Sequence, residues 1–167
     1  MQARIDLNLP RSLWTQRDSL VLASNTLASI KMRTSRGIDA TGNQFKGYST
    51  RPLYVLKRGA RLKPKGGRLS RTGRSVFYQN GYKQYKHESR RRGTPGESAE
   101  VDLVLSGNMM NNFVVKQATI NGFKLGLTQQ ANYGYSVNMD REFIGLTDQE
   151  VDILVRAVEF DLRRKLQ

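Results

Sequence analysis

Few side chains in this sequence have a type and spacing suited to acid–base or metal chemistry. His87 is the one histidine, and it lies between Lys86 and Glu88 in a basic region. Acid–base catalysis uses a histidine or paired carboxylates in a shaped site. The acids at Asp140–Glu142 and on the last predicted helix are explained by solvation and by the helix dipole. There is no cysteine for a thiolate metal site or a disulfide. We therefore expect no enzymatic activity, no metal site and no cofactor.

The distribution of positive charge is the strongest chemical signal in the sequence. The chain carries 28 Lys or Arg and 14 Asp or Glu, a net charge of +14. Between Arg51 and Arg92 there are 14 Lys or Arg against one acid, Glu88, which is a balance of +13. The other residues hold 14 basic and 13 acidic side chains, a balance of +1. Any electrostatic function should therefore reside in this one segment.

Aromatic residues alternate with these cations, which leaves two kinds of partner open. Lys and Arg beside Tyr and Phe can bind phosphates and stack on bases. Arg and Tyr are also enriched at protein interfaces. The apolar residues of the segment, such as Val55 and Val76, would be costly to leave in water and favour a protein partner. We expect protein contact, with nucleic-acid contact as the alternative and a solvated loop without a partner as the third reading. The candidate partner-binding residues are Arg51, Lys57, Arg58, Arg61, Lys63, Lys65, Arg68, Arg71 and Arg74.

The chain is long enough for one domain, residues 1–167, with the basic segment inserted as residues 51–93. Helical spacing predicts a long first helix from Pro10 to about Ser35, whose length exceeds what so small a domain can cover. Part of it should therefore meet another chain. Its apolar residues are Leu13, Leu20, Val21, Leu27 and Ile30. Glycines interrupt residues 51–93, so we expect an extended arm that is partly disordered without a partner, with a short helix near Gly81–Arg92.

The C-terminal half contains clearer local signals. Val101–Leu105 predicts a short helix or strand, and Tyr133–Val137 a strand. Asn121-Gly122 predicts a type I′ hairpin between Phe113–Ile120 and Phe123–Thr128. A capping box at Thr147-Asp148-Gln149-Glu150 opens a last helix. The apolar face predicted for that helix is Val151, Leu154, Val155, Val158 and Leu162. No apolar run is long enough to span a membrane, and no secretory leader is expected.

Three groups of short motifs follow one another along residues 20–162. The first is Ile30-Lys31-Met32-Arg33-Thr34, Gly37-Ile38-Asp39, Gly42, Phe45 and Tyr48-Ser49. The second is Tyr82, Tyr85-Lys86, Arg90, Gly93, Val101-Asp102-Leu103 and Leu105-Ser106-Gly107-Asn108-Met109-Met110. The third is Arg141-Glu142-Phe143-Ile144-Gly145-Leu146-Thr147. In this order the motifs resemble the phage virion morphogenesis and tail-completion protein family. The chain departs from the family pattern at Ser106, where Thr is usual, and over Ala131–Met139.

The resemblance implies an α+β fold, with a small curved antiparallel sheet flanked by a long N-terminal helix and a C-terminal helix. It implies a non-enzymatic structural subunit of a tailed-phage virion, made in the host cytoplasm, that forms a ring at the head–tail junction and joins head to tail. The implied partners are further copies of the chain and adjacent ring proteins, with packaged DNA in the ring as a further candidate and no membrane. The alternative is a nucleic-acid-binding module that uses the basic arm. The structural residues implied by the motifs are Arg33, Gly37, Asp39, Gly107, Arg141, Phe143 and Gly145.

Overall fold

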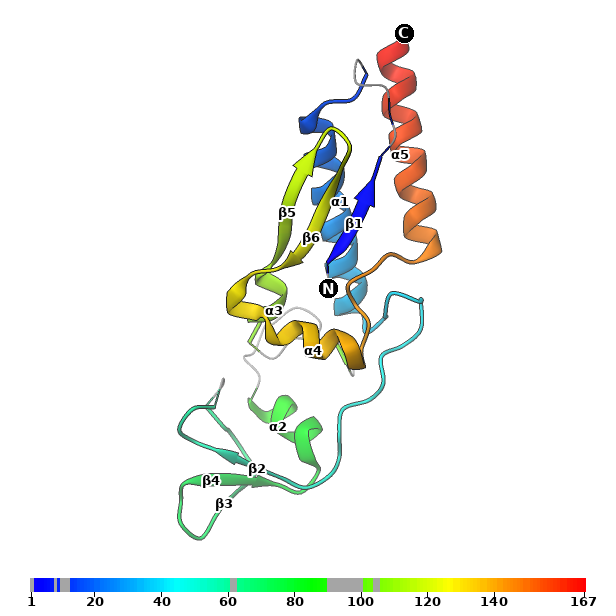
Figure 1. Cartoon of the computed structure of the whole chain (residues 1–167). Helices are drawn as coiled ribbons and strands as arrows, with labels where there is room; N and C mark the ends of the chain where they lie inside the picture. The colour runs from blue at the N-terminus through cyan, green and yellow to red at the C-terminus, as the bar shows by residue number, and fades with distance from the viewer. Residues whose placement is uncertain (1, 8, 10–12, 61–62, 90–100, 104–105) are drawn as a thin grey trace.

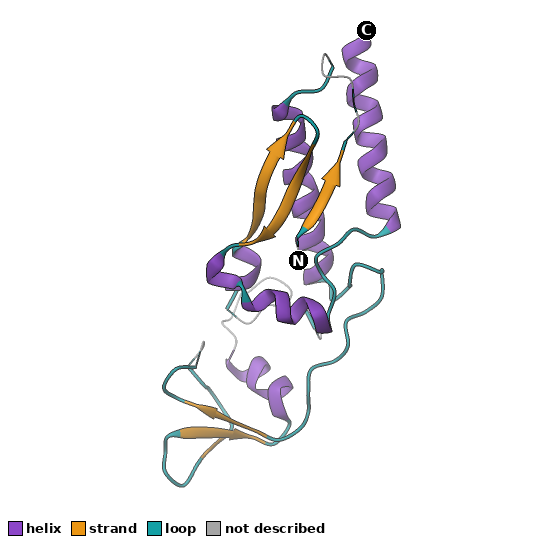
Figure 2. Cartoon of the chain, viewed as in Figure 1, coloured by secondary structure: helices purple, strands orange, loops and turns teal. Residues whose placement is uncertain are grey.

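The computed structural model describes residues 2–7, 9, 13–60, 63–89, 101–103 and 106–167, which form a body and a smaller insert (Figure 1 and Figure 2). The helices are α1 Gln16–Ser35, α2 Gly81–Ser89, α3 Asn108–Asn111, α4 Tyr133–Asp140 and α5 Asp148–Leu166. The strands are β1 Ala3–Asp6, β2 Leu53–Leu56, β3 Arg68–Leu69, β4 Ser75–Tyr78, β5 Phe113–Thr119 and β6 Gly122–Leu127. The insert comprises β2, β3, β4 and α2. The architecture is α+β with small antiparallel sheets, as predicted.

The body sheet has the strand order β1–β6–β5, and both strand pairs are antiparallel. β5 and β6 form the predicted hairpin, but its turn is not type I′. Ile120 and Asn121 connect the two strands, and neither has a positive φ. A type I′ turn requires positive φ at both central residues. Gly122 instead opens β6 with a φ of 142°, and a Cβ there would lie 2.0 Å from the Ile5 carbonyl oxygen. The glycine therefore permits the close pairing of β1 with β6.

α1 packs against β5 and β6, and the core of the body lies between them. Thr15 caps the helix through a capping box with Asp18, so α1 begins at Gln16, six residues later than the predicted start at Pro10. Pro10 itself lies outside the described residues. The predicted end at about Ser35 is confirmed. Ile30 is fully buried, whereas Leu20 and Val21 are exposed. These two exposed residues are consistent with the predicted contact with another chain but do not test it.

α5 runs beside α1 in the opposite direction, as two ion pairs demonstrate. Lys165 near the end of α5 pairs with Asp18, and Glu150 near its start pairs with Arg33. The capping box of Thr147 is confirmed. The predicted apolar face is wrong in part, because Val158 is buried with Leu154 and Leu162 packed on the core, but Val151 and Val155 are exposed. The apolar pattern of the helix is wider than the surface that α1 covers.

Tyr133–Val137 belongs to helix α4, and the prediction of a third strand there is wrong. β1 occupies the free edge of β6 that such a strand would need. Gly134 lies so close to Leu127 that a Cβ would meet its side chain at 2.5 Å, and packing of this kind overrides local strand preference. The buried Asn138 side chain then accepts the Phe143 and Ile144 N–H groups at 2.9 and 2.7 Å. Residues 101–103 are neither helix nor strand, and 104–105 lie outside the described residues.

The ion pair between α1 and α5 predicts a specific response to acid. The hydrogen bond from Lys165, followed by that from Thr15, lowers the pKa of Asp18 from 3.8 to about 2. The folded pKa is below the unfolded value, so this carboxylate stabilises the fold above about pH 4, and the stabilisation is lost as the pH falls toward 2. We expect Asp18→Asn to flatten the pH dependence of the unfolding free energy in that window, as measured by urea denaturation. Lys165→Met should remove most of the same dependence, and an unchanged slope in both variants would contradict this account.

Candidate functional site

Arg33 joins motif segments that are more than one hundred residues apart in the sequence. Its guanidinium donates to the Phe143 and Gly145 carbonyl oxygens at 2.8 and 3.1 Å and pairs with Glu150. Both partners of the ion pair are largely buried, at 8% and 14% exposure. Gly145 packs so closely that a Cβ would lie 2.9 Å from the Ala40 methyl group. Three residues singled out by the resemblance, Arg33, Phe143 and Gly145, therefore meet around one ion pair.

Gly37 and Asp39 shape the loop that follows α1. Gly37 has a φ of 82°, which lets the chain turn at the end of the helix. One Asp39 carboxylate oxygen accepts the Thr41 N–H and hydroxyl at 2.9 and 2.7 Å and the Asn43 N–H at 2.9 Å. The Ala40 N–H next to it donates to the Glu142 carbonyl at 2.7 Å. The loop is thus closed internally and fastened to the segment before α5.

Arg141 fixes the chain where the body meets the insert. It donates to the Lys46 and Gly47 carbonyl oxygens, each at 3.1 Å, and its guanidinium lies 5.2 Å from the centre of the Tyr48 ring. Gly107 does not join the Arg33 cluster but caps α3 with a φ of 79°. Both residues line the same hollow beside Tyr48. The motif residues therefore act as structural supports at two neighbouring places.

The insert is a folded unit, so the prediction of an extended arm is wrong for its described residues. Its strands form an antiparallel sheet in the order β2–β4–β3, and α2 covers one face. Val76, Tyr78 and Tyr85 are buried between sheet and helix, with Val55 and Tyr82 packed against them. The apolar residues that alternate along these strands were expected to need an external protein. They pack against α2 instead. The predicted short helix is confirmed over Gly81–Ser89.

The predicted partner-binding cations all point to solvent where the structure describes them. The exposed residues are Arg51, Lys57, Arg58, Lys63, Lys65, Arg68, Arg71 and Arg74. Arg61 lies outside the described residues. The sequence has no Asp or Glu between residues 51 and 87, so these charges have no acid within that stretch to offset them. The insert therefore presents an electrostatic surface that a negatively charged partner would neutralise.

The sheet face opposite α2, here called the open face, carries exposed apolar side chains beside this charge. Phe77 on the central strand β4 pairs with Tyr54 of β2 on one side and with Arg68 of β3 on the other. The Tyr54 and Phe77 rings pack with centroids 4.8 Å apart. Tyr54 and Leu56, which point to the same side of β2, are each 63% exposed. An apolar centre with a cationic rim is the composition of an interaction surface.

A ladder of tyrosines connects the insert to the body. The rings of Tyr78, Tyr85, Tyr82 and Tyr48 follow one another at centroid distances of 5.4, 5.9 and 5.3 Å. Edge-to-face pairs of this kind add to the stability gained by burial alone. Three rings belong to the insert, and Tyr48 belongs to the loop that Arg141 holds. The position of the insert is therefore set by packed aromatic side chains.

A buried ion pair strengthens the same junction, and it was not foreseen from the sequence. Lys86 of α2 pairs with Asp102, which is fully buried, and donates to the Tyr48 hydroxyl at 2.7 Å. The Leu103 N–H also donates to that hydroxyl, at 3.1 Å. Burial, followed by the charge of Asp102, raises the pKa of Tyr48 well above its usual range, so the hydroxyl stays protonated. The available signal was a carboxylate between two apolar residues, Val101-Asp102-Leu103.

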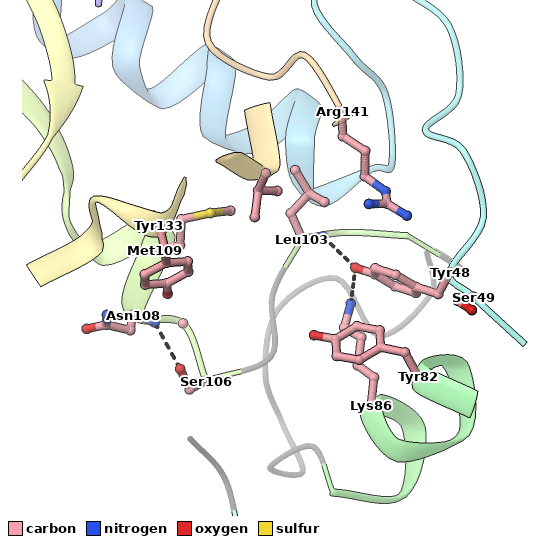
Figure 3. Close-up of a pocket in the computed structure, with 12 residues that line it drawn as sticks. Tyr48, Ser49, Tyr82, Lys86, Leu103, Ser106, Asn108, Met109, Tyr133 and Arg141 are labelled. Atoms are coloured by element: carbon pink, nitrogen blue, oxygen red, sulfur yellow. Dashed lines mark hydrogen bonds between the residues drawn. The ribbon is translucent and has the colours of Figure 1, made fainter. Parts of the chain in front are cut away.

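Beside this junction lies a hollow of about 280 Å³, shown in Figure 3. Tyr48, Tyr82 and Lys86 line one side of it, and Met109 and Tyr133 line the other. Its most strongly charged groups are already engaged, since Lys86 is paired with Asp102 and Arg141 with backbone carbonyls. Its chemistry is that of a packed joint between insert and body.

His87 is exposed on α2, and within the described ranges no group of three or more His, Asp or Glu side chains is placed to hold a metal ion. No helix in the described part of the chain is long and apolar enough to cross a membrane. The fold and its surfaces thus define a two-part α+β protein with a cationic insert. Neither known protein families, nor curated proteins, nor solved structures gave a match to this chain.

Proposed function

We propose that this chain is a structural subunit of a tailed-phage virion, which forms an oligomeric ring at the head–tail junction and joins head to tail. In this role the protein binds other proteins and needs no catalytic group or cofactor. Its partners are further copies of itself and the adjacent ring proteins of head and tail, and packaged DNA passes through the ring. The subunit is made in the host cytoplasm and ends in the virion.

The observation that carries the proposal is that most of the surface of α5 is exposed to solvent. Of its 19 residues, Val158 is the one that is buried, and large apolar side chains face solvent along the helix. These exposed residues are Val151, Ile153, Val155, Phe160 and Leu166. A helix with apolar residues on uncovered sides is typical of a subunit that buries them against another chain. Leu20 and Val21 of α1 are exposed as well.

The motif resemblance supports a virion assembly as the kind of complex that the chain joins. Residues of the first and third motif groups meet around Arg33, and Tyr48 of the first group meets Lys86 of the second and Arg141 of the third. This meeting of motif residues that are distant in the sequence supports the resemblance to virion morphogenesis and tail-completion proteins.

A nucleic-acid-binding module is the second candidate, and the exposed cations of the insert favour it. If the insert bound duplex DNA through about five phosphates, the logarithm of affinity would fall with the logarithm of salt at a slope near −4 to −5. A salt-sensitive monomer on DNA would support this candidate. A stable assembly without DNA supports the structural subunit.

Removal of the gene from the phage that encodes it tests the proposal directly. We expect filled heads and complete tails to accumulate unjoined, as seen by electron microscopy of the lysate. Purified protein added to that lysate should restore joined, infectious particles, because a structural subunit acts by binding. Normal joined particles in the absence of the protein would refute the proposed function, whatever the protein does on DNA.

A further inference from the structure

The open face of the insert has properties that favour a protein partner over nucleic acid. Its centre is apolar, formed by Tyr54, Leu56 and Phe77, and Arg68 extends the row of Tyr54 and Phe77 across the sheet. An exposed leucine gains nothing from a phosphate backbone, but it is stabilised by an apolar surface on a protein. The matching partner surface has apolar side chains at its centre and carboxylates around them.

One side of α5 has this complementary composition. Positions separated by three or four residues share a side of a helix. The rule groups three carboxylates with two valines on one exposed side of the first turns of α5, here called the acidic stripe: Asp148, Val151, Asp152, Val155 and Glu159. All five are exposed, and the stretch Asp148–Val155 contains no Lys or Arg, whereas Arg163 follows on the same side beyond the stripe. The acidic stripe thus offers the apolar contacts and the negative charge that the open face requires.

The two surfaces belong to different ends of the molecule. The insert sheet lies at the bottom of Figure 1, whereas α5 rises beside α1 on the far side of the body. The tyrosine ladder and the pair of Lys86 with Asp102 hold the insert in this position. The open face of one chain therefore meets an acidic stripe only when that stripe belongs to a second copy.

We propose that the subunits associate head to tail, with the open face of one copy docked on the acidic stripe of the next. This inference rests on the proposed function, in which the chain forms a ring, and it names the two surfaces that build the ring. The contact is heterologous, because each copy uses one surface to each side. Repetition of such a contact closes into a ring when the rotation between copies allows.

Charge reversal on each surface provides the test. Arg68→Glu with Arg74→Glu makes the insert surface less cationic, and Asp152→Lys with Glu159→Lys reverses two charges of the acidic stripe. All four side chains are exposed, so the fold should be retained. Each double variant should weaken self-association by about 100-fold or more, because the substituted positions no longer have an opposite charge facing them. The measurement is the distribution of assembled species by native mass spectrometry and analytical ultracentrifugation.

The decisive result is rescue. A chain that carries all four substitutions should assemble again, since reversed charges once more meet opposite charges. Mixing the two double variants should also give mixed assemblies. Matched controls change the net charge equally at exposed sites away from the two surfaces: Lys46→Glu with Lys116→Glu, and Asp140→Lys with Glu142→Lys. The controls should assemble as the natural sequence does.

Three outcomes would overturn the contact. The natural protein could remain monomeric at its highest soluble concentration, or either double variant could assemble normally. The third is that the chain with all four substitutions fails to assemble. Assembly without rescue would leave the ring and its role in joining heads to tails in place, but with other surfaces in contact. Binding of duplex DNA that is lost in Arg68→Glu with Arg74→Glu, while assembly is unchanged, would assign the insert to nucleic acid.

Discussion

Replacing Arg33 by methionine is expected to destabilise the protein by about 3–5 kcal/mol, because it leaves a largely buried carboxylate without its cation. Burial lowers the pKa of the Arg33 guanidinium, and the charge of Glu150 opposes that effect. The same guanidinium satisfies the Phe143 and Gly145 carbonyl oxygens. Methionine keeps the apolar stem but supplies none of these interactions. Urea denaturation at neutral pH measures the loss as a lower midpoint.

The matched control is the exposed pair of Arg164 with Asp161, whose arginine side chain is 67% exposed. Exposed pairs contribute little, so Arg164→Met should change stability by less than about 1 kcal/mol. Combining Arg33→Met with Glu150→Gln should cost less than Arg33→Met alone, because the unpaired charge is then removed. Equal losses from Arg33→Met and Arg164→Met would show that the buried pair is not the support that its geometry indicates.

The sequence predicted those elements whose signals are local. Each long helix has one boundary set by nearby residues. α5 starts after its N-cap Thr147, and α1 ends at Ser35, two residues before Gly37. The hairpin around Asn121 was found for the same reason, since a turn is specified by the few residues within it. Its turn type was not, because the position of Gly122 is set by the neighbouring strand β1, which is distant in the sequence.

Helices and strands that depend on tertiary contacts were not predicted from the sequence. Tyr133–Val137 has the composition of a strand, but β1 already fills the edge of β6, and Gly134 packs on Leu127 as part of a helix. The glycine-rich insert has strands of two to four residues, which are too short for alternation to stand out. Its core became recognisable once β2 and β4 were paired and covered by α2.

The sequence predicted which charged residues belong to the candidate site but not how its side chains are arranged in space. The exposed cations were identified correctly as a group, because a run of like charge stays in solvent unless it is paired. The open face was not, because the cross-strand row of Tyr54, Phe77 and Arg68 depends on strand register. Likewise Lys86 and Asp102 are 16 residues apart in the sequence and meet only through the fold. Motif order, by contrast, did identify residues that meet.

The last helix shows how periodicity can define a helix and still mislead about its environment. Val155 and Val158 both belong to the apolar pattern of α5, yet Val158 is 8% exposed and Val155 is 47% exposed. A charge at Val158 would have no partner in the core, which costs several kcal/mol, on the order of the whole stability of a small domain. Val158→Asp should therefore unfold the subunit, whereas Val155→Asp should remain folded with a melting temperature near that of the natural protein. Circular dichroism during heating distinguishes the two. Unfolding by both variants would mean that α5 turns both sides toward the body, and that its exposed apolar side is not free to bind a second copy.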